Sequence, residues 1–172
     1  MRVDVSGSKE SLPLEERIAM MEDLEAVRTL WAHYAFLADT ENIGASIAAL
    51  HTEDAVWTSR GAGNFGTYEG RSAIEGFFTA LYSVSPFRHH NMTNVYIDLS
   101  DDRKTATGRW NLIDFCTMAD GHTDAVLLIG RYECTFAKIE SGWQVSGVSL
   151  DSQLFSNWDK GWVVQPDRGQ SS

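Results

Sequence analysis

Two residue types that often work together in proton transfer, an aspartate and a histidine, stand far apart in this sequence. Asp39 ends a stretch with helical periodicity, and the pair His89-His90 begins a stretch with the alternating pattern of a strand. A neutral imidazole accepts a proton near neutral pH, and a carboxylate bonded to its other ring nitrogen stabilises the imidazolium. The pair therefore predicts proton abstraction, if the fold brings the two side chains together.

Strand alternation distinguishes the two adjacent histidines. His89 and His90 must point to opposite faces of a sheet, so one of them faces its concave side. By the same alternation, Met92 and Asn94 share a face with His90. Two surface or capping histidines explain the pattern equally well, and Asp39 can be a solvated residue at a helix end. A carboxylate there faces the negative end of the helix dipole, which favours an imidazole partner.

Other polar residues offer further chemistry. Tyr34 lies on the predicted helix before Asp39, and its hydroxyl can polarise a carbonyl or hold a leaving oxygen. A carboxylate pair such as Asp114 with Asp151 could do acid–base work, although strands facing solvent often carry such residues. The five histidines have neither the helical spacing of a zinc protease nor a His-x-His pair, so no metal is expected.

Two remaining motifs have structural interpretations. Cys116 and Cys134 lie within apolar strands and are predicted to be core residues. Gly61-Ala-Gly-Asn-Phe-Gly matches the letters of a dinucleotide-binding fingerprint. That fingerprint must open a helix, whereas a short strand-like segment follows here, which favours a hairpin loop.

The elements that position these residues are helical first and β afterwards. Apolar spacings of three and four predict helices over residues 15–39, 43–50 and 72–84. Apolar, β-branched and aromatic stretches predict strands over 55–59, 89–99, 105–118, 125–139 and 143–154. This order predicts an α+β fold, an antiparallel sheet with helices on one face. A long twisted sheet over one helical layer curls and can enclose a ligand cavity.

Composition limits the classes of function. The chain has 172 residues, 43% of them hydrophobic, which fits one globular domain over 15–164 with polar tails at 1–14 and 165–172. A net charge of −10 argues against binding to nucleic acid or to an anionic membrane surface. No apolar run suits a signal peptide or a membrane span, so a cytoplasmic location is expected.

Several segments resemble the polyketide-cyclase-like, scytalone-dehydratase-like branch of the nuclear-transport-factor-2-like (NTF2-like) superfamily. They are Asp39 with Tyr34 five positions earlier, Leu50-His-Thr-Glu-Asp-Ala-Val-Trp, Gly66-Thr-Tyr-Glu-Gly-Arg, His89-His-Asn-Met-Thr-Asn-Val, and Gly130-Arg-Tyr with Gly142-Trp-Gln-Val. The resemblance covers residues 20–155. It implies a cone of three helices against a strongly curved sheet, which encloses a deep pocket.

The resemblance also implies a reaction. Scytalone dehydratase, bile-acid 7α-dehydratase and hexachlorocyclohexane dehydrochlorinase use a buried His–Asp dyad and no cofactor. The histidine removes a proton, and a leaving group departs from the adjacent carbon. By motif position, His90 is similar to the base, Asp39 to its orienting carboxylate and Tyr34 to a dehydratase tyrosine. The dehydrochlorinase and bile-acid enzymes place an arginine near the position of Val148, where this chain has none.

Substrate-binding positions complete the predicted site. They are expected to line the pocket and hold a ring: Asn111, Trp57, Tyr132, Phe115, Met92 and Asn94. The sequence thus predicts a cofactor-independent lyase, most like a dehydratase, that acts on a hydrophobic cyclic or aromatic small molecule. A cyclase or isomerase of the polyketide-cyclase type and a non-catalytic ligand-binding module are the alternatives. A homo-oligomer, dimer or trimer, is expected, with Trp110, Cys134 and Phe136 on the sheet face that another subunit covers.

Overall fold

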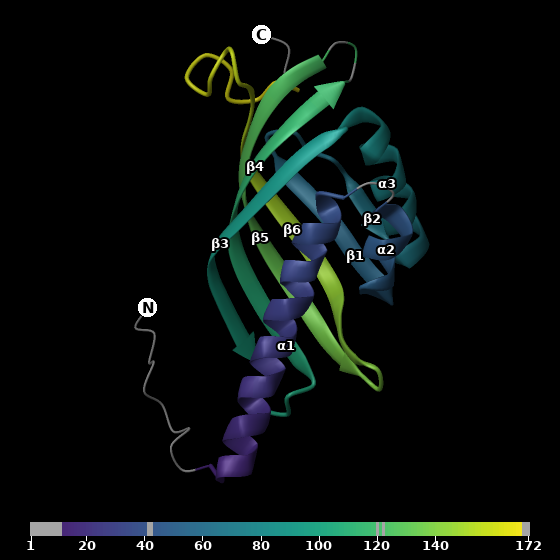
Figure 1. Ribbon diagram of the computed structural model, residues 1–172, viewed down its shortest axis with the longest axis vertical. Coiled ribbons are helices and arrows are strands. Elements are labelled where there is room, and N and C mark those ends of the chain that lie inside the picture. The colour runs from purple at the N-terminus through teal and green to yellow at the C-terminus, as the bar shows by residue number, and fades with distance from the viewer. Residues whose placement is uncertain (1–11, 41–42, 120, 122, 170–172) are drawn as a thin grey trace.

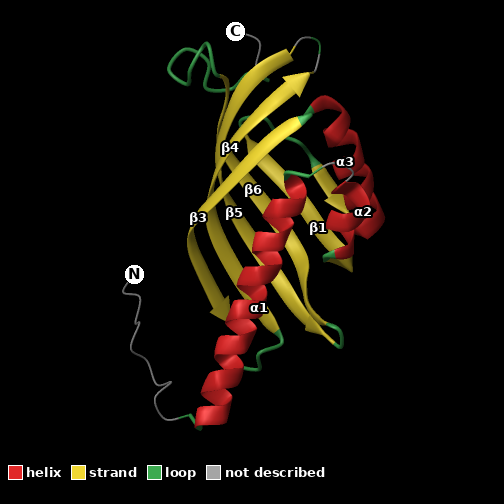
Figure 2. Ribbon diagram, in the orientation of Figure 1, coloured by secondary structure: helices red, strands yellow, loops and turns green. Residues whose placement is uncertain are grey.

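The computed structural model describes residues 12–40, 43–119, 121 and 123–169. Three helices and six strands follow one another along the chain (Figures 1 and 2). They are α1 (Leu14–Ala38), α2 (Ile43–Ala49), β1 (His51–Gly61), β2 (Thr67–Glu69), α3 (Arg71–Val84), β3 (Phe87–Leu99), β4 (Thr105–Ala119), β5 (Thr123–Ile139) and β6 (Gly142–Asn157).

The strands form one curved sheet in the order β2-β1-β6-β5-β4-β3. Strands β1 and β6 pair in parallel, and the other neighbours pair antiparallel. The helices lie on one side of this sheet, with α1 across its concave face and α2 and α3 beside β1 and β2 (Figure 1). The predicted α+β architecture, a helical layer on a curved and mostly antiparallel sheet, is confirmed.

Helix α1 packs through a single stripe of buried residues. Val27, Trp31, Tyr34 and Ala38 follow one another at spacings of four, three and four, so they share one face of the helix. Burying a large apolar side chain of this kind stabilises the fold by roughly 1.5–3 kcal/mol. The stripe holds α1 against the sheet and so determines where the last turn of the helix lies.

A buried carboxylate holds the other end of α1. Asp23 accepts hydrogen bonds from Lys138 Nζ at 2.5 Å, Arg103 Nε at 2.8 Å and Trp143 Nε1 at 3.0 Å. Burial raises the pKa of Asp23, but these hydrogen bonds outweigh burial and the pKa ends below its ordinary value. This cluster links α1 to the hairpin ends of the sheet.

Alternation along β4 separates the two faces of the sheet. Its even-numbered residues from Ala106 to Met118 are buried under the helices, and its odd-numbered residues point outward. Trp110, Cys134 and Phe136 therefore belong to the core, at 0–3% exposure, and the prediction that they form an outer, subunit-covered face is wrong. The prediction that both cysteines are core residues is confirmed.

The C-terminal segment returns to the sheet. Phe155 donates its backbone N–H to Pro166 O at 3.0 Å, and Arg168 donates its own to Phe155 O at 2.6 Å. Asp167 Oδ1 accepts the backbone N–H of Gly63 at 3.2 Å. The predicted tail from 165 onward is thus bonded to the domain as far as residue 169. Most of the predicted N-terminal tail lies outside the described residues.

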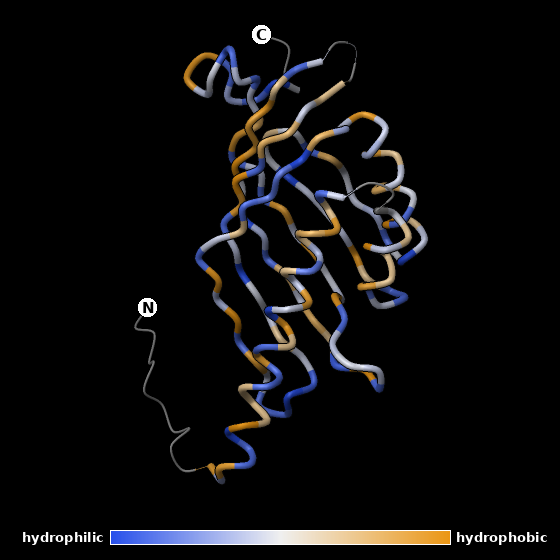
Figure 3. Tube along the Cα trace, viewed as in Figure 1, coloured by the Kyte–Doolittle hydropathy of each residue, from blue (hydrophilic) through white to orange (hydrophobic). Residues whose placement is uncertain are grey.

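Hydrophobic and hydrophilic residues mix along α1 (Figure 3). In the described part of the chain, no helix has the length and apolar character needed to cross a membrane.

Candidate active site

The end of α1 meets the beginning of β3 at an Asp–His contact. His90 Nδ1 lies 2.7 Å from Asp39 Oδ1, and the backbone N–H of His90 donates to both carboxylate oxygens at 3.1 Å. The side chain of His90 is 10% exposed and that of Asp39 is 24% exposed. With Nδ1–H donating to the carboxylate, a neutral His90 keeps Nε2 as its proton acceptor. The structure therefore brings together the two residues that the sequence analysis paired.

A buried arginine holds β3 against the helix end. Arg88 Nε donates to Ala38 O at 2.6 Å, and its Nη1 donates to Ser85 O at 2.5 Å. The last carbonyls of a helix lack partners within the helix, and a cation is favourable there because the dipole is negative. Arg88 therefore satisfies the end of α1 and keeps β3, with His90 two residues on, beside Asp39.

A second carboxylate lies near the same ring nitrogen of His90. Asp114 Oδ1 is 3.8 Å from His90 Nδ1, and Asp114 is 6% exposed. Burial lowers the pKa of His90, but Asp114 and Asp39 outweigh burial, and the pKa ends above its ordinary value. The neighbouring His89 is 62% exposed, as expected for a strand residue next to an inward-facing one, and its Nδ1 lies 3.9 Å from Asp39 Oδ2.

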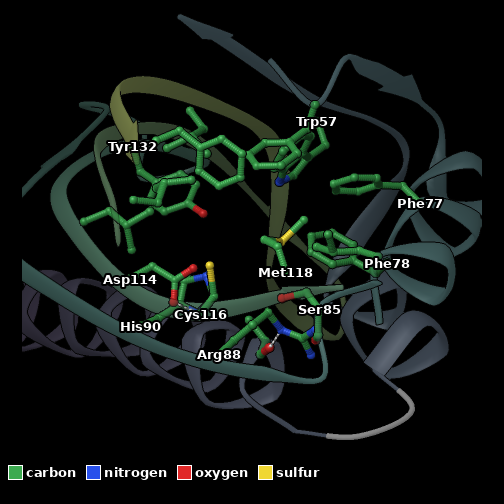
Figure 4. A pocket seen from close by; sticks show the side chains of 17 residues that line it. Trp57, Phe77, Phe78, Ser85, Arg88, His90, Asp114, Cys116, Met118 and Tyr132 are labelled. Atoms are coloured by element: carbon green, nitrogen blue, oxygen red, sulfur yellow. Dashed lines mark hydrogen bonds and ion pairs between the residues drawn. The ribbon is translucent and has the colours of Figure 1, made fainter. Parts of the chain in front are cut away.

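His90 and Asp114 form part of the wall of a cavity between the sheet and the helices (Figure 4). The cavity and its open mouth together contain about 530 Å³ of empty space. Aromatic rings form much of the wall: Trp57, Phe65, Phe77, Phe78 and Phe155. The polar groups in the wall belong to Ser85, Arg88, His90, Asp114, Cys116 and Tyr132. An apolar cavity with a few polar groups is the usual form of a site for an organic ligand.

Residues 19–149 match the family model of the SnoaL-like domain. The protein belongs to this family. The match confirms the predicted resemblance to polyketide-cyclase-like and scytalone-dehydratase-like proteins.

Solved structures with this fold include three from Novosphingobium. A proposed aromatic ring hydroxylase of Novosphingobium aromaticivorans is 28% identical, with 80% of this chain and 94% of that chain covered at a TM-score of 0.72. A proposed scytalone dehydratase of the same species is 20% identical, with 88% and 97% covered at 0.69. The dehydrochlorinase LinA-type3 of Novosphingobium barchaimii is 18% identical, with 82% and 91% covered at 0.66. Among curated proteins, no significant match to the sequence is found.

In this SnoaL-like domain, Trp57 and Tyr132 lie where the sequence analysis expected them, in the cavity wall. The Tyr132 side chain is 3% exposed, and its hydroxyl has no hydrogen-bond partner among the described residues. Burial raises the pKa of Tyr132 well above its ordinary value, and the nearby Tyr34 and Asp114 add to this effect. The hydroxyl therefore stays protonated and can donate a hydrogen bond to a ligand.

Tyr34 does not line the cavity of this SnoaL-like domain. Its hydroxyl accepts the indole N–H of Trp57 at 3.0 Å, its ring stacks on Trp31, and its side chain is fully buried. The predicted role of Tyr34 as the electrophilic hydroxyl is therefore corrected. It holds Trp57 in the cavity wall, whereas Tyr132 lines the cavity itself.

A β-bulge explains why other predicted residues lie outside the cavity. The turn pairs Leu99 with Ala106, and an uninterrupted hairpin would place His90 opposite Phe115 and Asn94 opposite Asn111. Between Thr93 and Tyr96 the register shifts by one residue, and Asn94 adopts a positive φ of 55°.

The shift changes which side chains share the face of His90. It pairs His90 with Asp114, so Phe115 and Asn111 lie on the outer face, and Asn94 is exposed. Met92 is half-buried and packs on the core outside the group of cavity-lining side chains. The predicted placement of Asn111, Phe115 and Asn94 in the pocket is corrected for this reason. Met92 shares the inner face with His90, but it is not among the residues that line the cavity, so its predicted place there is corrected as well.

The sequence patterns did not indicate Arg88, Ser85 or Cys116 as site residues, and they indicated Asp114 only as a possible partner of Asp151. Asp114 could have been found only from the register of β3 against β4, and the bulge shifts that register so that His90 pairs with Asp114 instead of Phe115. Arg88 shares the face of His90 two residues away, a signal that alternation alone could have provided. It places a guanidinium in the cavity wall from β3.

The two remaining motifs have structural roles. The segment from Gly61 to Gly66 connects β1 to the antiparallel β2, which confirms the predicted hairpin loop. In the described part of the chain, no group of three or more His, Cys, Asp or Glu side chains could hold a metal ion.

Proposed function

We propose that the protein is a cofactor-independent lyase, most like a dehydratase, that acts on a neutral hydrophobic cyclic or aromatic small molecule. One observation carries the proposal: a buried imidazole, bonded to a carboxylate, stands in the wall of an apolar cavity. Among structures with this fold, the names scytalone dehydratase and dehydrochlorinase describe eliminations, and the name aromatic ring hydroxylase describes a ring substrate.

The proposed reaction assigns one role to each polar group. His90 Nε2 removes a proton from a carbon of the substrate, and the electron pair of the broken C–H bond forms a C=C bond. The C–O bond on the adjacent carbon breaks, and the departing hydroxyl takes the proton back from His90 and leaves as water. Asp39 keeps the imidazole oriented and stabilises its charged form, and the Tyr132 hydroxyl donates to the oxygen on which charge develops.

A substrate screen tests this proposal. The purified protein is incubated with a panel of hydroxylated cyclic and aromatic ketones, and the products are analysed by mass spectrometry for loss of water. We expect at least one member to lose water faster with protein than without it. A rearranged product of unchanged mass would favour the isomerase or cyclase alternative. Tight binding without turnover across the panel would contradict the lyase and favour a binding module.

A further inference from the structure

Asp114 occupies a position that the proposed function does not yet use. It lies on β4 directly opposite His90 in the β3–β4 pair, and it is 6% exposed. Its Oδ1 accepts the backbone N–H of His89 at 3.1 Å and lies 3.8 Å from His90 Nδ1. Asp114 lines the cavity whereas Asp39 does not, so a bound ligand meets the carboxylate of Asp114.

The charged and titratable groups around His90 come from several elements. They are Asp39 at the end of α1, Arg88 and His89 on β3, Asp114 and Cys116 on β4, and Tyr132 on β5. In the described part of the chain, His90 is the only titratable basic side chain within 4 Å of the Asp114 carboxylate. Arg88 lies nearby, but its bonds go to the carbonyls of Ala38 and Ser85.

A carboxylate in an apolar wall is costly to keep unless a nearby positive charge compensates it. The imidazolium that His90 becomes after accepting a proton is such a charge, and two carboxylates lie within 4 Å of its Nδ1. With Asp39 and Asp114 ionised and Arg88 charged, the site has a net charge of minus one while His90 is neutral. This negative charge favours a proton on His90 and disfavours binding of an anionic ligand in the cavity.

We propose that Asp114 is a positioning residue for the proton transfer, which stabilises the imidazolium of His90 and restricts the cavity to neutral ligands. The first half rests on the proposed function, because it assumes that His90 carries the proton. Both halves follow from one placement, a buried carboxylate that faces the cavity and the imidazole together (Figure 4).

Titration of the His90 ring tests the first half without any substrate. The Cε1–H signal of His90 is followed by NMR across pH in the wild type and in Asp114→Asn. We expect the titration midpoint of Asp114→Asn to fall by about one pH unit, a tenfold loss of proton affinity. Asp151→Asn is the matched control, because Asp151 is part-exposed, pairs with Arg60 and lies outside the cavity. An unchanged midpoint in Asp114→Asn would overturn this half.

Ligand selectivity tests the second half on the wild-type protein first. Naphthalene carboxamide and naphthalene carboxylate have the same ring and nearly the same shape, and they differ in charge. Above the His90 midpoint, calorimetry should show at least about tenfold tighter binding of the amide, which corresponds to about 1.4 kcal/mol. In Asp114→Asn this ratio should shrink, and in Asp151→Asn it should persist.

Equal or tighter binding of the carboxylate by the wild type would overturn the selectivity, as would failure of both compounds to bind. If Asp114→Asn does not fold, as judged by circular dichroism, the wild-type ratio still decides the second half. Asp114→Glu, which keeps the charge, then decides the first half. A His90 midpoint like that of the wild type would support it, and a lowered midpoint would overturn it. Neither measurement requires turnover, so a failed substrate screen and a failed role for Asp114 give different results.

Discussion

Two tyrosine hydroxyls lie near the proposed reaction centre, and their hydrogen bonds separate their roles. Tyr34 accepts the indole N–H of Trp57, whereas Tyr132 has no partner among the described residues and lines the cavity. The first hydroxyl is therefore a structural group, and the second is available to a ligand.

Replacing each tyrosine by phenylalanine should separate these roles. Tyr132→Phe should lower kcat by roughly 10²–10³, the effect of losing one donor to a developing negative charge, with little change in stability. Tyr34→Phe should lower the free energy of unfolding by about 1 kcal/mol, because Trp57 loses its acceptor. Steady-state kinetics and urea unfolding measure the two effects. A larger loss of kcat in Tyr34→Phe than in Tyr132→Phe would reverse the assignment.

At the same scale, sequence reasoning identified Asp39 and His90 but missed the groups around them. A carboxylate at the negative end of a helix needs a donor, and one of two adjacent strand histidines must face inward, so local rules indicated both residues. Tyr132 rather than Tyr34 takes the proposed role because the Tyr34 hydroxyl already accepts the indole N–H of Trp57 across the core. No pattern along the chain predicts that bond.

Among the secondary-structure elements, the helices were predicted more accurately than the strands, because apolar periodicity marks a helix but strand ends depend on pairing with distant segments. The apolar stripe of α1 predicted 15–39, close to the observed Leu14–Ala38. Strand β1 begins earlier than predicted, at His51, because its first residues are largely polar and it pairs in parallel with the distant β6. The bulge at Asn94 is a single inserted residue without a distinctive sequence signal, yet it changes the face of every residue before it.

The first residue of β1 makes the fold sensitive to acid. His51 is fully buried, its Nδ1 bonds to Ile47 O at 2.8 Å, and its Nε2 has no partner among the described residues. Burial lowers the pKa of His51 to about 4, the Ile47 carbonyl opposes this, and Arg71 adds to it. Because this value lies below the 6.5 of an ordinary histidine, the unfolded chain binds a proton more readily than the folded protein.

Stability should therefore fall as the pH drops from about 6.5 to about 4, by roughly 3 kcal/mol from this group. In His51→Gln, which cannot take up a proton, the fall over this interval should be smaller by that amount. Urea unfolding at a series of pH values measures it, and His33→Gln on the exposed face of α1 is the control. Parallel stability curves for the wild type and His51→Gln would contradict this account.

On the surface of the molecule, the outer face of the sheet carries large apolar side chains that are exposed and lie outside the core. Phe87, Phe115 and Trp158 are exposed beside one another around a shallow hollow, and the rings of Phe115 and Trp158 are 6.0 Å apart. These residues replace Trp110, Cys134 and Phe136 as the apolar part of that face. The homo-oligomer expected from the family resemblance stays a prediction.

The global fold was predictable from sequence because helix stripes, strand alternation and the order of elements all favour one arrangement. The lining of the cavity was not, since it depends on the register of two neighbouring strands and on side chains that meet across the sheet. Function depends on those contacts more than on the architecture.

If His90 removes the proton, its loss must abolish turnover, whereas the loss of an exposed histidine must not. With a substrate from the screen, turnover is measured for His90→Ala and for His33→Ala, whose side chain is exposed on α1. We expect a loss of roughly 10²–10⁴-fold in His90→Ala and near wild-type turnover in His33→Ala, with both variants folded. Wild-type turnover by a folded His90→Ala, or an equal loss in both variants, would contradict this role of His90.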